Sequence, residues 1–180
     1  MNNYIIPFSA LHAKDVALVG GKNASLGEMI NQLSSLGINI PDGLAINTKA
    51  YFEFIAANSI EENLKKQLAS LNPHTLETLP EVSAACKSII KNGHFHEALV
   101  EELKMAYEAL LKKYGNAISL AVRSSATAED SPTASFAGQH ESFLNVSGFE
   151  SILEAVQKCY ASVFNERAIK YRIDNGFAHM

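Results

Sequence analysis

The chain has 180 residues, of which 47% are hydrophobic and 19% are charged, and its formal net charge is −4. This length suits one domain or a large part of one, and the composition is that of an ordinary globular protein. The negative charge argues against general binding to nucleic acid or to anionic membranes, so an anionic ligand would have to be met by local groups.

The sequence shows no sign of export or of membrane insertion. No apolar run approaches the roughly 20 residues that cross a bilayer, and the N-terminus has no basic stretch followed by an apolar one. Cys86 and Cys159 have neither close pairing nor a metal-type spacing, which favours reduced, apolar cysteines. We therefore expect a soluble, cytoplasmic protein with no membrane partner and no nucleic-acid partner.

Two short strands and a helix are predicted in the first quarter of the chain. Residues 4–8 form a strand candidate that a proline would end, and residues 44–46 form a second, buried one. Between them, Asn23 or Ser25 is expected to cap a helix that Gly37 terminates.

Helices are predicted almost throughout residues 48–114, with Thr48 as the first N-cap. Prolines and glycines divide this stretch into separate helices. The apolar stripes expected to face a core are Ile60, Leu64, Leu68 and Leu71, then Val82, Cys86, Ile89 and Ile90, then Leu99, Leu103, Tyr107, Leu110 and Leu111. We interpret this region as scaffold.

The last third of the chain predicts a strand over residues 118–122 and a partner strand over residues 143–146. A helix after Gly148 would bury Ile152, Val156, Tyr160, Val163 and Phe164, and residues 167–172 continue as helix. The expected fold class is therefore α+β, rich in helix, with a small and mainly antiparallel sheet.

Gly20, Gly21, Lys22 and Asn23 place two glycines and a lysine at the start of a predicted helix. Glycines let the backbone approach a ligand closely, and a helix N-terminus beside an ammonium group suits a phosphate. The order differs from the P-loop pattern, because only Gly-Gly-Lys is present. From spacing alone, a Gly-Gly turn with a solvated lysine is the simpler interpretation.

Arg123, Ser124 and Ser125 lie at the end of a predicted strand. A guanidinium group offers a planar fork to phosphate oxygens, and the two hydroxyls add small donors. The alternative is that Arg123 pairs with Glu129 or Asp130 and holds the following loop in place.

The connection from Thr127 to His140 is far longer than a hairpin turn and is rich in Ser, Thr, Ala and Gly. Small residues let backbone amides fold over an anion, and Phe136 could anchor the segment by packing. Loops of this length are commonly functional, so we interpret this one as a lid over a phosphate.

Other constellations carry weaker signals. His94 and His96 have a metal-type spacing but no third ligand, so no metal site is predicted. Glu28 could support Lys22 or be solvated. A Ser-His-Asp set could be assembled from Ser124, His140 and Asp130, but it lacks the nucleophile-elbow pattern. The cluster expected to form a salt-bridged basic helix surface is Arg167, Lys170 and Arg172.

Four strings of the sequence, taken in order, resemble the N-terminal part of the phosphoenolpyruvate synthase family of PEP-utilising enzymes. They are VGGKNASLGEMI, IPDGLAINTKAYFEF, AVRSSATAEDSPTASFAGQHESFLNV and ASVFNERAIKYR. With the helical spacer, they cover nearly the whole chain. Pyruvate phosphate dikinases and rifampicin phosphotransferases share the broader domain, with looser versions of the second and third strings.

The resemblance implies that residues 1–180 form the N-terminal portion of an ATP-grasp-type nucleotide-binding domain. Lys22 and Arg123 would contact the nucleotide phosphates, Gly138 would belong to the phosphate-covering loop, and Ser142 would contact the nucleotide from the following strand. The residues that would support the phosphate loop are Ser124, Ser125, Ser135, Ala137 and Gln139. The same resemblance implies ATP and Mg²⁺ as cofactors.

The implied reaction converts ATP, pyruvate and water into AMP, phosphoenolpyruvate and phosphate through a phosphohistidine, in gluconeogenesis. The second half of the ATP-grasp domain with its Mg²⁺ ligands, the phosphohistidine domain and the pyruvate-binding domain would lie outside this chain, so no catalytic residue is assigned within it. Its partners would be ATP, those remaining domains and, in the full-length enzyme, pyruvate. Thr133 and His140 depart from the family pattern, which has Asp and Gln there, and we interpret both as loop variations.

Two alternatives stay open. The chain could be a fragment of a related dikinase or rifampicin phosphotransferase. It could also be a non-catalytic protein-interaction module whose helical middle binds a partner. Retention of Lys22, Arg123 and Gly138 together argues against the module, because a protein that binds no nucleotide would not need all three.

Overall fold

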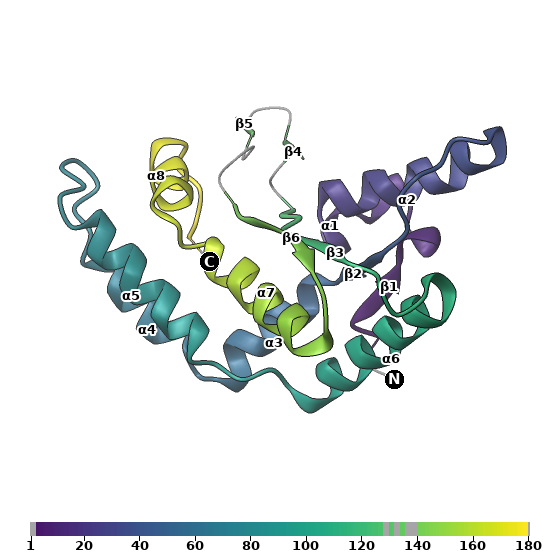
Figure 1. Ribbon diagram of the computed structural model, residues 1–180. Coiled ribbons are helices and arrows are strands. Elements are labelled where there is room, and N and C mark those ends of the chain that lie inside the picture. Colours follow the sequence, from purple (N-terminus) through teal and green to yellow (C-terminus); the bar gives the residue numbers. More distant parts are fainter. Residues whose placement is uncertain (1–2, 128–129, 132–133, 136–139, 180) are drawn as a thin grey trace. The chain divides into compact units, whose positions relative to one another are not determined.

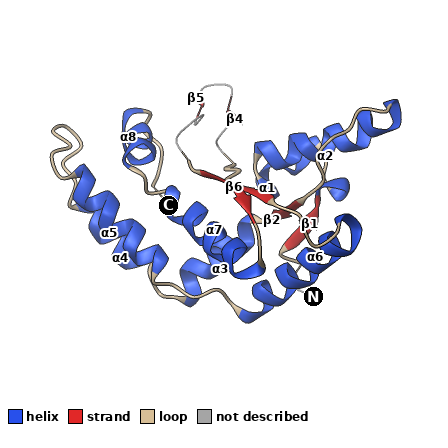
Figure 2. Cartoon of the chain, viewed as in Figure 1, coloured by secondary structure: helices blue, strands red, loops and turns tan. Residues whose placement is uncertain are grey.

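The computed structural model describes residues 3–127, 130–131, 134–135 and 140–179. Helices make up most of it and the strands are short (Figure 2). The chain divides into two compact units. The first comprises Met1–Glu53, Phe95–Ile118 and Ser125–Ser135, and the second comprises Phe54–His94, Ser119–Ser124 and Phe136–Met180.

The helix-rich α+β class is confirmed, but the predicted small sheet is divided. The described strands form three separate two-stranded sheets, and each pair is antiparallel. In the first unit, β1 (Ile5–Pro7) pairs with β2 (Leu44–Ile46); the sequence predicted both strands but not their pairing. Pro7 takes the last position of β1, opposite Leu44, and the Phe8 N–H after it donates to the Gly43 carbonyl at 3.0 Å. Because hydrogen-bonded and non-hydrogen-bonded pairs alternate along an antiparallel ladder, Pro7 occupies a position at which no N–H is needed.

The first long helix, α2 (Gly21–Leu33), follows the short α1 (Val16–Val19). It begins earlier than predicted, because its N-cap is Gly20 with φ of 79°, a conformation that L side chains rarely adopt. Asn23 and Ser25 therefore lie inside the first turns, and both predicted caps were wrong.

A short 3₁₀ turn, η3 (Ser34–Leu36), continues the chain beyond α2. Gly37 ends it in the left-handed conformation with φ of 78°, so the predicted terminator is confirmed. A Cβ at Gly37 would meet no atom within 4 Å. The glycine is needed at this position for its backbone conformation and not for space.

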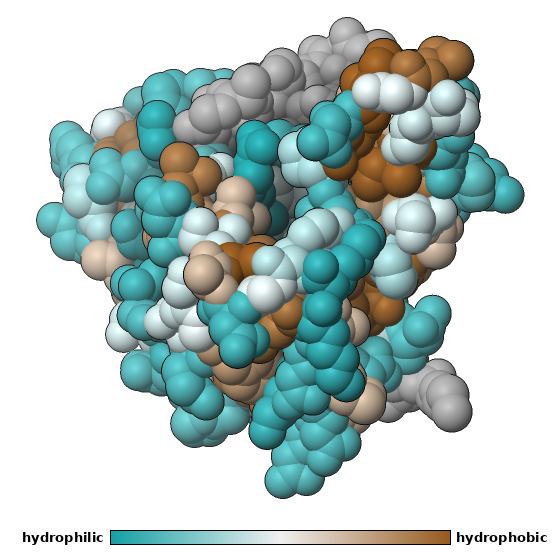
Figure 3. Space-filling view, turned by 45° about the vertical axis from the view of Figure 1, so that its right-hand side comes forward, coloured by the Kyte–Doolittle hydropathy of each residue, from teal (hydrophilic) through white to brown (hydrophobic). Residues whose placement is uncertain are grey.

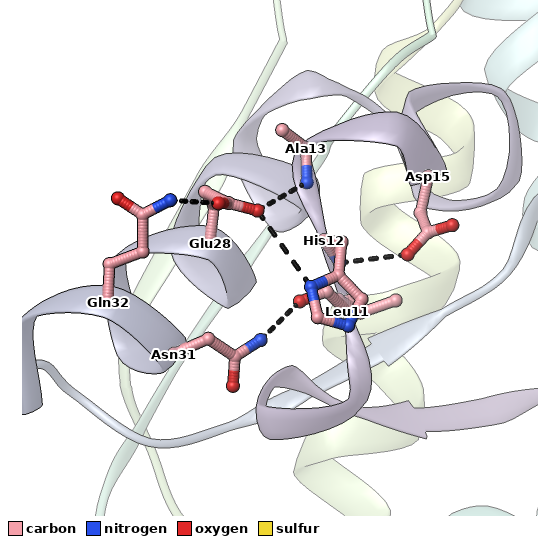
Figure 4. Close-up of polar contacts among 7 residues, drawn as sticks. All are labelled: Leu11, His12, Ala13, Asp15, Glu28, Asn31 and Gln32. Atoms are coloured by element: carbon pink, nitrogen blue, oxygen red, sulfur yellow. Dashed lines mark hydrogen bonds and ion pairs between the residues drawn. The ribbon is translucent and has the colours of Figure 1, made fainter.

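The polar side of α2 is fastened to the chain that precedes α1 (Figure 4). Glu28 accepts a hydrogen bond from the Ala13 N–H at 2.9 Å and another from the Gln32 side chain. One Glu28 oxygen also lies 3.9 Å from His12 Nδ1. Glu28 thus holds the preceding segment against α2, a role that neither interpretation of the sequence had given it.

The helix α3 (Thr48–Ala57) is capped by Asn47, whose side chain accepts from the Ala50 N–H at 3.1 Å. Thr48, which the sequence predicted as the cap, is the first helical residue instead. The boundary between the two units falls within this helix, after Glu53.

The helix α6 (Glu97–Tyr114) completes the first unit. His96 caps it by accepting from the Ala98 N–H at 3.2 Å. Glu102 fastens the helix to the start of β1, because its carboxylate accepts from the Tyr4 N–H at 2.6 Å. The buried apolar cluster of this unit is Leu11, Val19, Ala24 and Ala45, with Ile6, Phe8 and Val16 packed against it.

The second unit contains α4 (Glu61–Ala69), α5 (Leu79–Lys91), α7 (Phe149–Ser162) and α8 (Glu166–Asp174). The helix α5 packs against the other three. Its core confirms the predicted burial of Leu64, Cys86, Ile90 and Phe164, whereas Ile89 and Val163 are only half-buried. Phe54 and Ile169, which belong to no predicted stripe, are buried as deeply. Burial raises the pKa of the Cys86 thiol to about 11, so this cysteine is a protonated core residue.

Arg172 departs from the predicted basic surface. It is only 5% exposed, and it donates to the Val163 carbonyl at 2.7 Å and to His179 Nδ1 at 3.1 Å. Burial and the neighbouring guanidinium lower the pKa of His179, which favours the neutral ring that can accept this bond. Lys170 does form the expected surface ion pair, with Asp174 at 2.6 Å.

Apolar side chains also reach the surface, where Figure 3 shows them as brown atoms among teal polar ones. The most exposed of the large hydrophobic residues are Leu36, Leu144, Met105 and Phe52. They belong to different elements, and single exposed hydrophobic residues are normal on soluble domains. Among the described residues, no helix has both the length and the apolar character needed to span a bilayer.

We predict that Ser83→Ala destabilises the protein by about 1–2 kcal/mol. Ser83 is 1% exposed on α5, and its hydroxyl donates to the Phe164 carbonyl at 2.8 Å, so the substitution removes a buried hydrogen bond. Urea unfolding would measure the change. Ser88→Ala on the exposed side of the same helix is the matched control, and equal effects of the two substitutions would contradict the prediction.

A second prediction concerns Asp42, which accepts from Lys113 Nζ at 2.8 Å and from the Tyr114 hydroxyl at 2.9 Å. Partial burial alone would raise the pKa of Asp42, but these bonds and one from the Gly43 N–H outweigh it and hold that pKa below its ordinary value. A carboxyl whose pKa is lower in the folded state contributes stability above its unfolded pKa of about 4 and loses it as the pH falls through the folded pKa.

Asp42→Asn should therefore lower the unfolding temperature at pH 7, and the difference from wild type should shrink as the pH falls below about 4. Thermal unfolding followed by circular dichroism across this range would measure it. Glu101→Gln, an exposed change of the same charge on α6, is the control. A difference that stays constant with pH would contradict the assignment.

Candidate functional site

The strands β3 (Leu120–Arg123) and β6 (Ser142–Val146) form an antiparallel pair in the second unit (Figure 1). Their register sets Arg123 directly opposite Ser142. Both residues are exposed, and side chains of directly opposed residues leave the same face of a sheet with Cβ atoms about 4.5–5.5 Å apart. The structure therefore brings together two of the residues that the sequence predicted to contact phosphate.

A β-bulge in β6 produces this register. Leu120 is paired with Val146 and Val122 with Phe143, so one residue of β3 opposes two residues of β6. Asn145, one of those two, has φ of 56°, in the left-handed region that asparagine tolerates better than most residues.

The bulge decides which side chains of β6 face outward. In a regular strand counted back from Val146, Leu144 would face the helices and Phe143 would face out. With one extra residue, Phe143 is half-buried and Leu144 is 68% exposed, while Ser142 turns to the outer face. The hydroxyl of Ser142 is beside Arg123 because of this single insertion.

The helix α7 supports the inner face of the pair. It packs on both β3 and β6, and the Sγ of Cys159 lies 3.8 Å from the Val122 carbonyl. Burial, together with the nearby Glu141 charge, raises the pKa of Cys159 to about 12, so the thiol stays protonated and can donate. The outer face is thus presented on a fixed support.

A shallow hollow opens beside β6, bordered by Ser142, Leu144, Ser151 and Lys158. The ammonium group of Lys158 could in principle bind a phosphate in this hollow. However, its Nζ pairs with Glu154 at 2.7 Å and lies over the ring of Phe143. We therefore assign Lys158 to the scaffold of this surface.

The end of the long loop is held on the second unit. His140 Nδ1 lies 3.4 Å from the Ser162 carbonyl, and the Asn165 side chain donates to Glu141 at 3.3 Å. These contacts fix the chain immediately before Ser142. His140 is thus engaged with backbone at the end of α7.

Lys22 lies in the first unit, as the second residue of α2. Its position agrees with the prediction that it stands at a helix start. The N-cap Gly20 has no side chain and makes no side-chain capping bond, so another group must satisfy the first turn.

Ser125 supplies that group from far along the sequence. Its Oγ accepts from the N–H of Asn23, the third residue of α2, at 3.1 Å. A Cβ added at Gly20 would overlap the carbonyl and hydroxyl groups of Ser125. No pattern in the sequence indicates this contact, because the two partners are 102 residues apart.

The remaining predicted site residues are described only in part. Ser124 connects Arg123 to Ser125, and the backbone of Ser135 belongs to β5 (Ala134–Ser135), which pairs with β4 (Asp130–Ser131). The predicted loop residues that lie outside the described residues are Ala137, Gly138 and Gln139. The lid interpretation therefore stays a prediction.

No group of three or more His, Cys, Asp or Glu side chains that could hold a metal ion occurs in the part of the chain that the structure describes. His96 is used as a helix cap, and the His94 N–H donates to the Asn58 side chain at 2.8 Å. These residues do not fit a metal site, and we derive no chemistry from one.

Comparison with known proteins places this surface in a family. Residues 16–180 match the family model described as "Pyruvate phosphate dikinase, AMP/ATP-binding domain". The chain belongs to this family. The match spans α2, β3 and β6, so the family's nucleotide-binding domain contains all of the surfaces described above.

Several curated relatives carry the name phosphoenolpyruvate synthase. The chain is 45% identical to that of Neisseria meningitidis over 99% of its length, 46% identical to that of Aquifex aeolicus over 92%, and 42% identical to that of Escherichia coli over 97%. It spans only about a fifth of each relative, with 22%, 20% and 22% covered. Further domains are therefore part of the relatives' architecture.

For this member of the family, we predict that Gly20→Ala is far more harmful than Gly115→Ala. The two glycines have nearly the same backbone conformation, with φ of 79° and ψ of 164° at Gly20 and φ of 89° and ψ of 167° at Gly115, so the backbone strain from a new Cβ is matched, at about 1–3 kcal/mol. Only at Gly20 would the Cβ overlap Ser125, whereas a Cβ at Gly115 would meet no atom within 4 Å. We expect an additional loss of about 1–3 kcal/mol for Gly20→Ala.

Urea unfolding of both variants would measure the difference. Because strain is matched, the excess loss reports the close approach of residue 125 to the helix start. Equal free energies of unfolding for the two variants would show that this approach does not contribute to stability.

Proposed function

We propose that this chain binds the phosphates of ATP as the N-terminal part of a phosphoenolpyruvate synthase. The reaction of that enzyme would convert ATP, pyruvate and water into AMP, phosphoenolpyruvate and phosphate, and its direction would serve gluconeogenesis. The observation that carries the proposal is the exposed cross-strand pair of Arg123 and Ser142, in a chain that matches an AMP/ATP-binding domain.

The chemistry of the pair suits a phosphate. A guanidinium group is always charged and offers two parallel N–H donors to a pair of phosphate oxygens. The Ser142 hydroxyl adds a donor on the same face, within reach of the same anion. Neither residue is buried, so a ligand can approach without opening the fold.

Lys22 would contact the phosphates from the start of α2. The N-terminus of a helix carries a partial positive charge, and an ammonium group at the second position adds a full one. Gly138 would cover the phosphates by its backbone, as the loop of glycine and small residues around it suggests.

Positioning and charge neutralisation are the contributions expected from these residues. Phosphoryl transfer needs little covalent help from the protein, so lysine and arginine contacts to the nucleotide phosphates can supply much of the stabilisation. The acceptor histidine, the pyruvate site and the groups that would hold Mg²⁺ are proposed to lie in domains outside this chain. We assign no catalytic residue within it. A cytoplasmic location is part of the same proposal.

The test is a chimera in which this chain replaces the matching segment of the Neisseria meningitidis relative. We expect pyruvate-dependent formation of AMP from ATP. Lys22→Ala and Arg123→Ala should each lower kcat/KM for ATP by about 10- to 100-fold, because each removes a charge-assisted contact.

Two matched controls are Lys66→Ala and Arg167→Ala, which remove exposed cations from α4 and α8. Both should leave kcat/KM within about twofold, as expected for exposed helix positions. A folded chimera without ATP-dependent activity, or site variants that behave like the controls, would reject the proposal. Formation of AMP that does not depend on pyruvate would instead favour a related phosphotransferase.

A further inference from the structure

We propose that Ser125 is a positioning residue for nucleotide binding, acting through the first turn of α2. This inference rests on the proposed function, because it concerns how Lys22 is held for a phosphate. The sequence suggested that the Ser125 hydroxyl donates directly to phosphate. The role proposed here is different, because the hydroxyl acts on the helix that carries Lys22.

The first argument is the missing cap. The opening turn of a helix leaves backbone N–H groups without partners, and a serine, threonine, aspartate or asparagine at the N-cap normally accepts one of them. Here the N-cap is Gly20, which has no acceptor, and the Asn23 N–H is satisfied by Ser125 Oγ at 3.1 Å. A residue remote in sequence therefore does the work of the cap.

The second argument is the space made for that hydroxyl. Gly20 is the residue at which a Cβ would collide with Ser125. A glycine at this point costs the helix its local cap but admits the chain at residue 125. The absence of a side chain at Gly20 makes the space that the Ser125 hydroxyl occupies. We call this contact between Gly20, Asn23 and Ser125 the joint.

The third argument is what the joint holds. Lys22 lies between the N-cap and Asn23, in the turn that Ser125 closes. On the other side, only Ser124 separates Ser125 from Arg123 in the sequence. One short segment thus carries Arg123, a proposed phosphate contact, and Ser125, whose hydroxyl orders the turn. That turn contains Lys22, a second proposed phosphate contact.

A side bond strengthens the same turn. Asn23 Nδ2 donates to the Val19 carbonyl at 2.9 Å, joining α2 to the end of α1. Asn23 is therefore held by its side chain and by its backbone N–H. Loss of Ser125 Oγ would free the N–H while leaving the side-chain bond, so the expected effect is local fraying and not loss of the helix.

If the joint assists binding, linkage requires the reverse effect as well. A contact whose loss weakens nucleotide binding by some factor must itself be strengthened by bound nucleotide, by up to the same factor. A merely structural cap would stabilise the fold without this reciprocity. The linkage separates the two roles.

The experiment uses the ¹⁵N-labelled chain, MgATP as the probe, and amide exchange and chemical shifts as readouts. In Ser125→Ala we expect the Asn23 amide to exchange about three- to tenfold faster and MgATP to bind about three- to tenfold more weakly. Ser88→Ala, an exposed serine on α5, should change neither quantity. In the unmodified chain, MgATP should slow exchange at Asn23 by a similar factor.

The outcomes distinguish the two proposals. A folded chimera without ATP-dependent activity would overturn the proposed function and this inference with it, whereas the absence of any saturable MgATP-induced shift in the unmodified chain would overturn only the inference, which requires the first turn of this chain to respond to nucleotide. Binding that is unchanged in Ser125→Ala despite faster Asn23 exchange would overturn the inference alone. If Ser125→Ala does not fold, the unmodified chain still decides, because Asn23 exchange that ignores saturating MgATP contradicts the coupling.

Discussion

The close approach of Ser125 to Gly20 is the constraint on which the start of α2, with the proposed phosphate contact Lys22, depends. Two parts of the chain that are 102 residues apart meet there through one hydrogen bond and through the absence of one side chain. A helix that began with its own serine cap would need no capping group from a distant segment. Because Gly20 provides no cap, the order of the first turn of α2 depends on the position of the segment that contains Ser125.

A second local irregularity has an equally large effect. The extra residue in β6, accommodated by the left-handed Asn145, reverses the faces of everything before it in that strand. Phe143 packs toward the helices and Ser142 faces out beside Arg123 because of it. The outer face of the sheet, which carries Arg123 and Ser142, and the apolar support behind it are therefore set by the same backbone feature.

The sequence predicted most helices and strands, because their apolar periodicity is strong. It also predicted Arg123 and Ser142 at the ends of paired strands, and Lys22 at a helix start. It failed where a partner is remote: Asn23 and Ser25 were wrong as caps because Ser125 and Gly20 share that role, and Arg172 was misplaced because its burial depends on how α8 packs. The bulge could not be predicted either, because Leu144 and Val146 are apolar residues two apart, the pattern of a regular strand.

The first unit is assembled from separate stretches of sequence, and this has a consequence for the order of events during synthesis. The hydrogen bond from the Tyr4 N–H to Glu102 joins residues 98 positions apart, and the one from Lys113 to Asp42 joins residues 71 positions apart. Closing loops of this length costs chain entropy before any contact compensates for it. On a ribosome, β1 and β2 would emerge long before α6 could cover them, and the helices α4 and α5 would appear in between. The nascent N-terminal sheet therefore remains without the helix that packs against β1 until α6 has been synthesised.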